Sequence, residues 1–215
     1  MGVLDGKDQH GPVDWFNEQM STLLDTHETE ISTIQGANTG NVGAAAGTGV
    51  VAVETGYGDY KTTVLTLTNT PIVLVDNAGV VAHGGLKVYD FPLGLVYVQA
   101  CVLNAATTLS AAGVDATWEG DVGVGTVVAD TGNTLATTEQ NIIPTTEIAA
   151  AVASVGICDC VSTASEHVIF DGTGGAIDVY INMLVDDANH DVTSTPTNII
   201  LNGTMRLNWI YMGDI

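Results

Sequence analysis

The chain has 215 residues, enough for one sizeable domain with an appendage, and 46% of them are hydrophobic, so a buried core is expected. Four lysines and arginines stand against 25 aspartates and glutamates, which gives a formal net charge of −21 at pH 7. A field of that sign repels phosphate backbones and anionic lipid surfaces. Nucleic acid and membranes are therefore disfavoured as partners.

The N-terminal stretch MGVLDGKDQHGPVDWF has no basic region followed by an apolar one, and no apolar run approaches the roughly 20 residues of a membrane-spanning helix. Cys101, Cys158 and Cys160 form an odd set, and the CDC spacing is too tight for an ordinary disulfide. We expect reduced thiols in a protein made in a cytoplasm.

An N-terminal arm is predicted over residues 1–35. The spacing of Phe16, Met20, Leu23 and Leu24 matches one helical face, but the threonine-rich stretch THETEIST that follows argues against a long helix. Residues 36–49, GANTGNVGAAAGTG, carry no large side chain and predict a linker. A phosphate-binding loop is not predicted there, because the lysine and the following helix pattern are missing.

From residue 50 to residue 215 the apolar pattern has period two, which predicts β-strands. The run GLVYVQACVL is expected to place Val96, Val98, Ala100 and Val102 on one side of a strand. Two later runs are the strongest strand signals, and their apolar positions are Ile177, Val179, Ile181, Met183 and Val185 in one and Ile199, Leu201, Met205, Leu207, Trp209 and Tyr211 in the other. Glycine-rich turns between the runs favour an all-β antiparallel sandwich of jelly-roll type, with a short helix near Thr145 or Thr146.

The acidic stretch LVDDANHDVTSTP, residues 184–196, lies between those two strands. Asp187, Asn189 and Asp191 fit the first three ligand positions of a calcium loop, but Val192 stands at the glycine position and Asn198 at the bidentate glutamate position. We interpret the stretch as a solvated loop, with these three residues as a weak metal candidate. The common catalytic motifs are missing from the sequence, so no enzyme and no cofactor are predicted.

Several stretches resemble virion structural proteins of tailed bacteriophages. They are TGYGDYKTTVLTLTNTPIVLVDNAG (55–79), LKVYDFPLGLVYVQ (86–99), EQNIIPTT (139–146), VIFDGTGGAIDVYINMLVDD (168–187) and DVTSTPTNIILNGTMRLNW (191–209). The resemblance implies a β-sandwich on the capsid surface, most like a head decoration (cement) protein that binds the major capsid protein. Head symmetry then suggests a homotrimer. Its arm would reach capsid subunits through the anchors Trp15, Phe16, Met20, Leu23 and Leu24.

Two alternatives stay open. One is a tail or baseplate β-sandwich that binds host glycans, with Tyr57, Tyr60, Trp118 and Tyr180 as candidate rings for sugar stacking. The other is a hydrolase assembled from distant residues. Because β-sandwiches host many unrelated functions, the fold alone does not choose between them.

Overall fold

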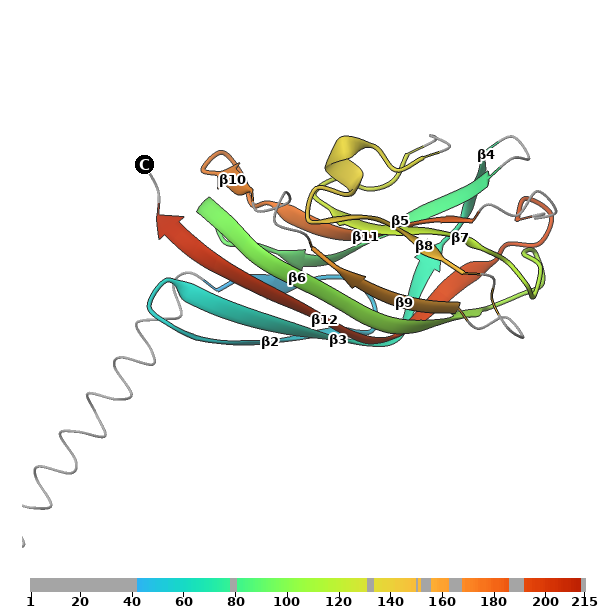
Figure 1. Cartoon of the computed structure of the whole chain (residues 1–215), viewed down its shortest axis with the longest axis horizontal. Coiled ribbons are helices and arrows are strands. Elements are labelled where there is room, and N and C mark those ends of the chain that lie inside the picture. The colour runs from blue at the N-terminus through green and yellow to red at the C-terminus, as the bar shows by residue number, and fades with distance from the viewer. Residues whose placement is uncertain are drawn as a thin grey trace, which may run out of the picture. The chain divides into compact units, whose positions relative to one another are not determined.

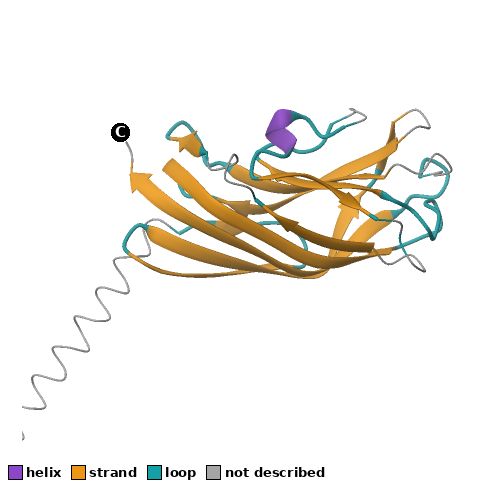
Figure 2. Cartoon of the chain, in the orientation of Figure 1, coloured by secondary structure: helices purple, strands orange, loops and turns teal. Residues whose placement is uncertain are grey.

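The structure is a computed structural model, and it describes residues 42–77, 81–130, 134–149, 151, 156–162, 168–185 and 192–213. Strands in these ranges form two six-stranded sheets, which face each other (Figure 1). All pairings between the described strands are antiparallel. The described part of the chain contains a single short 3-10 turn, η2 (Thr137–Glu139) (Figure 2). The predicted all-β antiparallel sandwich is confirmed.

Sheet A has the strand order β1-β5-β11-β7-β8, with β4 pairing β5 beside β1. Its strands are β1 (Ala44–Ala45), β4 (Val75–Asn77), β5 (Val81–Asp90), β7 (Gly120–Gly125), β8 (Ile143–Ile148) and β11 (Asp178–Val185). Sheet B has the order β10-β6-β12-β3-β2, with β9 also pairing β6. Its strands are β2 (Val50–Tyr57), β3 (Tyr60–Val73), β6 (Gly94–Leu109), β9 (Gly156–Val161), β10 (Ile169–Gly172) and β12 (Asn198–Gly213).

The predicted alternation of β11 and β12 is confirmed. Val179, Ile181, Met183 and Val185 face the core from sheet A. Ile199, Leu201, Met205, Leu207 and Trp209 face it from sheet B. Phe91 packs edge-on against Trp209 and Tyr89, with ring centroids 5.3 Å apart in both pairs. Edge-to-face contacts of this kind add stability beyond the area that the rings bury.

The predicted alternation of β6 is wrong in its second half. Val96 and Val98 face the core as expected, but Cys101 is buried and Val102 is exposed. The register between β6 and β12 shifts between Asn208 and Trp209, so β6 carries an extra residue there. A β-bulge moves every later side chain to the opposite face, which explains the reversal.

Two further expectations need correction. The helix expected near Thr145 or Thr146 is strand β8, which pairs with β7. Backbone pairing with a neighbouring strand decides the structure there, against a local pattern that suggested a helix. Residues 42–49, assigned from the sequence to the linker, belong to the same compact unit as the sandwich, and Ala44 and Ala45 pair with β5.

The outer face of sheet A is partly covered by one segment, whose described residues are 126–130 and 134–142 (yellow in Figure 1). The side-chain amide of Asn182 binds this segment through three hydrogen bonds, all at 2.8 Å. Nδ2 donates to the carbonyls of Val127 and Glu139, and Oδ1 accepts from the N–H of Ala129. Gly85 lies opposite Asn182 in the register, and a Cβ there would come within 2.3 Å of Oδ1. A small apolar cluster of Ala129, Leu135 and Leu184 forms beneath the segment.

A chain of polar groups connects the two sheets inside the core. The Trp209 indole N–H donates to Thr63 Oγ1 at 2.9 Å, Thr63 donates to Tyr89 Oη at 3.2 Å, and Tyr89 donates to Glu54 Oε2 at 2.7 Å. Lys61 Nζ lies 3.9 Å from the other carboxylate oxygen of Glu54. Burial is the main cause that raises the pKa of Tyr89, so its hydroxyl keeps its proton and its role as donor.

We expect Tyr89→Phe to lower the free energy of unfolding by about 1–3 kcal/mol, because Glu54 and Thr63 lose a buried partner. Urea denaturation at pH 7 measures the change. Tyr60→Phe is the matched control, since it removes the same hydroxyl group from a tyrosine that is 64% exposed. Equal stability of the two variants would contradict the role given to the polar chain.

Candidate interaction surface

The outer face of sheet B is exposed, and it is nearly uncharged over the four long strands, whereas the short edge strands β9 and β10 add the exposed Asp159 and Asp171. Its four long strands, β2, β3, β6 and β12, contain three charged residues, Glu54, Lys61 and Arg206. Glu54 and Lys61 are largely buried and pair with each other, which leaves Arg206 as the charge on the outside. The outward side chains otherwise alternate apolar and neutral polar types. They include Val51, Val53, Thr55, Thr62, Val64, Thr66, Ile200, Asn202, Thr204 and Asn208 on β2, β3 and β12, and Val102, Asn104 and Ala106 on β6.

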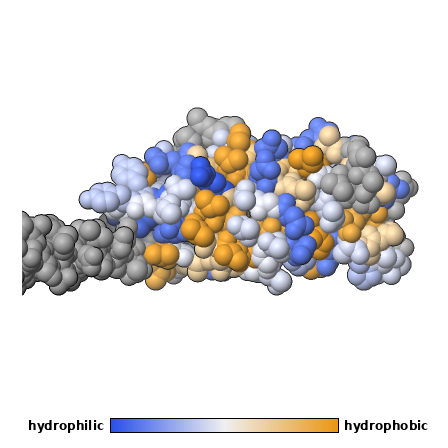
Figure 3. All heavy atoms as spheres, turned by 90° about the horizontal axis from the view of Figure 1, so that it is seen from below, coloured by the Kyte–Doolittle hydropathy of each residue, from blue (hydrophilic) through white to orange (hydrophobic). Residues whose placement is uncertain are grey.

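Figure 3 views the molecule from the side of sheet B and shows hydrophobic patches interrupted by pale and hydrophilic ones. Neutral polar groups on this face are paired with one another. Thr62 donates to Asn208 Oδ1 at 2.9 Å, and the Asn69 backbone N–H donates to Asn202 Oδ1 at 2.8 Å. Such a surface loses few hydrogen bonds to water when another protein covers it.

Arg206 lies at the middle of this face. It belongs to β12, the central strand of sheet B, and its directly paired neighbours are Val64 on β3 and Val102 on β6. The chain has four cationic residues, and two of the others, Lys61 and Lys87, are bound to carboxylates. Within the described ranges, no acidic side chain forms an ion pair with Arg206.

Arg206 was not among the residues singled out from the sequence. One signal was available: a rare cation at an outward position of an otherwise uncharged strand. Arginine is enriched at the energetic centres of protein interfaces, because its planar fork binds carboxylates and packs on apolar surface. The arrangement therefore suits an uncharged or locally acidic protein partner.

Two of the four candidate sugar-stacking rings lie together. Tyr57 and Tyr60 form the last cross-strand pair of the β2–β3 hairpin and are 84% and 64% exposed. Between them, Gly58 has a φ of 59°, as the first central residue of a type II′ turn requires. Residues directly opposite in an antiparallel pair have neighbouring side chains, so the two rings form one exposed platform.

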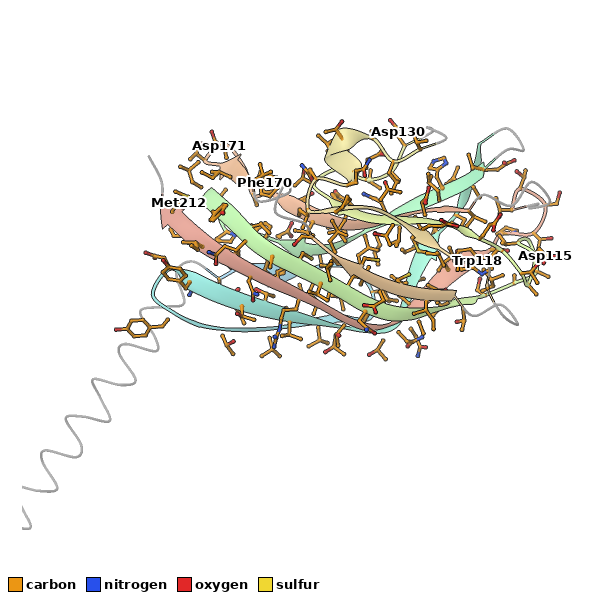
Figure 4. All side chains as sticks on the ribbon, in the orientation of Figure 1. Asp115, Trp118, Asp130, Phe170, Asp171 and Met212 are labelled. Carbon is orange, nitrogen blue, oxygen red and sulfur yellow. The ribbon has the colours of Figure 1, made fainter. Side chains whose placement is uncertain are left out.

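The other two rings are not part of that platform. Trp118 is buried, and it lies at the end of the sandwich opposite to Met212 (Figure 4). The hairpin end is the Met212 end, since Tyr60 pairs with Ile210. Tyr180 belongs to sheet A, where its hydroxyl donates to Asp178 Oδ2 at 2.9 Å.

An acidic pair stands on the outer face of sheet A. Asp90 and Asp178 are directly opposite each other across β5 and β11, and Lys87 Nζ binds both, at 2.6 and 3.0 Å. Burial and the neighbouring Asp178 raise the pKa of Asp90, against the effect of Lys87. Burial would also raise the pKa of Asp178, but hydrogen bonds from Asp90, Lys87 and Tyr180 outweigh it and lower that pKa. Because Lys87 occupies both carboxylates, the group is suited to holding two strands together.

The remaining predicted sites lie outside the described residues. This applies to the arm anchors Trp15, Phe16, Met20, Leu23 and Leu24, and to the weak metal candidate Asp187, Asn189 and Asp191. Within the described ranges, no group of three or more metal-ligating side chains is close enough to hold an ion. None of the described residues forms a helix long and apolar enough to cross a membrane.

The three cysteines are free thiols buried against the core. Cys101 is fully buried and packs as a small hydrophobe. Burial raises the pKa of Cys158 to about 12 and also raises the pKa values of Cys101 and Cys160. The thiolate is the reactive form, so these side chains are chemically quiet in the folded protein.

Comparison with known proteins gives little. No family model and no curated protein matches the sequence. Among solved structures, the chain is similar to the enzymatically active domain of tailspike protein 4 of bacteriophage CBA120, at 12% identity and a TM-score of 0.23. The match covers 78% of this chain and 19% of the tailspike chain. A TM-score of this size does not establish a shared fold.

We expect Lys87→Met to destabilise the protein at pH 7 by on the order of 1 kcal/mol, because two adjacent carboxylates lose their shared cation. The effect is this small because solvent partly screens the interaction between these charges. The lowered pKa of Asp178 stabilises the fold at neutral pH and less as the pH falls, whereas the raised pKa of Asp90 has the opposite dependence. Without Lys87, protonation of one carboxyl relieves the repulsion, so the loss should shrink near pH 4. Urea denaturation midpoints at pH 7 and pH 4 measure the loss of stability, with Lys87→Arg as the control. A loss of stability that is larger at pH 4 than at pH 7 would contradict this expectation.

We also expect the thiols to be unreactive until the protein unfolds. A thiol reagent at pH 8 should modify none of the three cysteines in the native protein at early times, and all three in guanidinium chloride. Rapid native modification of Cys158 or Cys160 would show that β9 opens readily. Fewer than three thiols after unfolding would reveal a disulfide.

Proposed function

We propose that this chain is a non-enzymatic virion structural protein of a tailed bacteriophage, and that it decorates the capsid by binding the major capsid protein. The observation that carries the proposal is the outer face of the four long strands of sheet B, where Arg206 is the one outward charge, on a chain of net charge −21. A face that collects neutral side chains on so acidic a protein is suited to contact with another protein. The resemblance of residues 55–209 to phage virion proteins supplies the kind of partner.

Two internal features support a structural role. Glu54, at the end of the polar chain, is bound by Tyr89 and Lys61. Asp90 and Asp178 are both bound by Lys87. Carboxylates used in this way hold sheets and strands in place. A decoration protein benefits from such a rigid sandwich, because a preorganised surface binds with a smaller entropic cost.

A tail or baseplate protein that binds host glycans is the second candidate. The exposed platform of Tyr57 and Tyr60 favours it, because sugar rings stack on exposed aromatic side chains and the acidic field of the chain would admit neutral sugars. Its position at the hairpin tip leaves the rings accessible.

Copy number in purified virions separates the two proposals. Quantitative mass spectrometry should find hundreds of copies per particle for a head decoration protein and a handful for a tail protein. Absence from the particles would overturn both proposals.

Binding of the purified protein to phage heads tests the surface itself. We expect Arg206→Glu to weaken binding strongly, by about tenfold or more, because a central interface arginine is replaced by the opposite charge. Val127→Glu is the control, since Val127 is 45% exposed and belongs to the segment that covers sheet A. Equal binding of both variants, or a greater loss with Val127→Glu, would reject the sheet B face.

A further inference from the structure

The edges of the two sheets differ in how they are protected against pairing with another chain. An open edge exposes unpaired backbone groups, and proteins block it with short strands, prolines, charges or bulges. In sheet A, β1 has two residues, β4 has three, and β8 contains Pro144 and the exposed Glu147. In sheet B, β9 carries the exposed Asp159, and β10 has four residues that include Asp171.

Strand β2 is the exception among the described edges. It has eight residues, VVAVETGY, with no proline, and its register with β3 contains no bulge. Along its far side, no described strand pairs with it. Val51 and Val53 point outward and are 61% and 58% exposed. The single charge of the strand, Glu54, points inward and pairs with Lys61.

From this edge we propose that β2 pairs with β2 of a second copy of this chain, antiparallel and across a two-fold axis, so that the two B sheets become one continuous sheet. Local charge permits this occupant, because the general repulsion between two acidic chains is not increased at a strand whose single charge is paired. On a chain of net charge −21, β2 approaches its own copy without bringing two uncompensated charges together. Backbone hydrogen bonds then supply affinity, as in other cases of strand addition.

The face alternation restricts the register. Directly paired residues in an antiparallel ladder point to the same side, so outward residues must meet outward residues. One register that satisfies this places Val53 opposite Val53 of the second copy and Val51 opposite Thr55. Glu54 then lies opposite Ala52, so the two glutamates do not face each other. The strand is therefore self-complementary about a two-fold axis.

This inference goes beyond the proposed function and differs from the homotrimer that head symmetry suggested. A pairing of two identical edges is isologous and closes with two copies, because each edge is used up by the other. The free protein is therefore a dimer, whatever larger structure it later joins.

Sedimentation analysis of the full-length chain tests the proposal without any virion. We expect a mass of twice 22.2 kDa for the unmodified protein. Val53→Lys should raise the dimer dissociation constant by about tenfold or more, because two lysines meet at the axis. The same substitution lowers the general repulsion between copies, since the net charge changes from −21 to −20 (one positive charge added). Weaker association would therefore come from the strand contact.

Val73→Lys is the matched control. Val73 is 61% exposed on β3 and pairs with Asn198 of β12, so it adds the same charge to the same sheet away from the β2 edge. Circular dichroism and thermal melting verify that both variants fold. A dimer that Val53→Lys dissociates and Val73→Lys preserves supports the proposal. A single-chain mass, a three-chain mass, or a dimer that responds equally to both substitutions overturns it.

Discussion

A β-sheet has two faces, and a sandwich buries only one face of each sheet against the other. In this protein the inner faces of the two sheets meet around Trp209, Phe91 and Tyr89. The chain itself also covers part of the outer face of sheet A. Asn182 binds the segment over sheet A through three hydrogen bonds to the backbone of Val127, Ala129 and Glu139. The described chain provides no comparable cover for sheet B, so the outer face of that sheet meets solvent or a partner.

The outer faces of the two sheets also differ in charge. The four long strands of sheet B keep one charge on their outer face, while acidic side chains lie on sheet A (Asp90, Asp178 and Glu147) and on the short edge strands of sheet B (Asp159 and Asp171). A strongly acidic chain stays soluble through repulsion between copies. Where that repulsion is locally absent, contact with another protein costs least, and Arg206 adds an attraction for carboxylates at the centre.

Much of the fold could be predicted from residue pattern alone. The alternation around Val179–Val185 and Ile199–Trp209 reports burial on one side of a strand, and that burial is what the structure shows. The phase change in β6 could not be predicted, because a bulge depends on how two strands align. The strand at Thr145 could not be predicted either, since its pairing with β7 is a tertiary interaction. Of the candidate rings, Tyr57 and Tyr60 could be paired through the Gly58 turn, but the burial of Trp118 depends on packing from distant segments.

Hydroxyl-radical footprinting of the protein, free and on the particle, tests most directly whether sheet B is the interaction surface. Met212, Tyr57 and Tyr60 are exposed on the sheet B side, and Val127 and Val128 are exposed on the segment that covers sheet A. We expect the first group to lose reactivity on the particle and the second group to keep it. Protection of Val127 and Val128, with Met212 still oxidised, would contradict it.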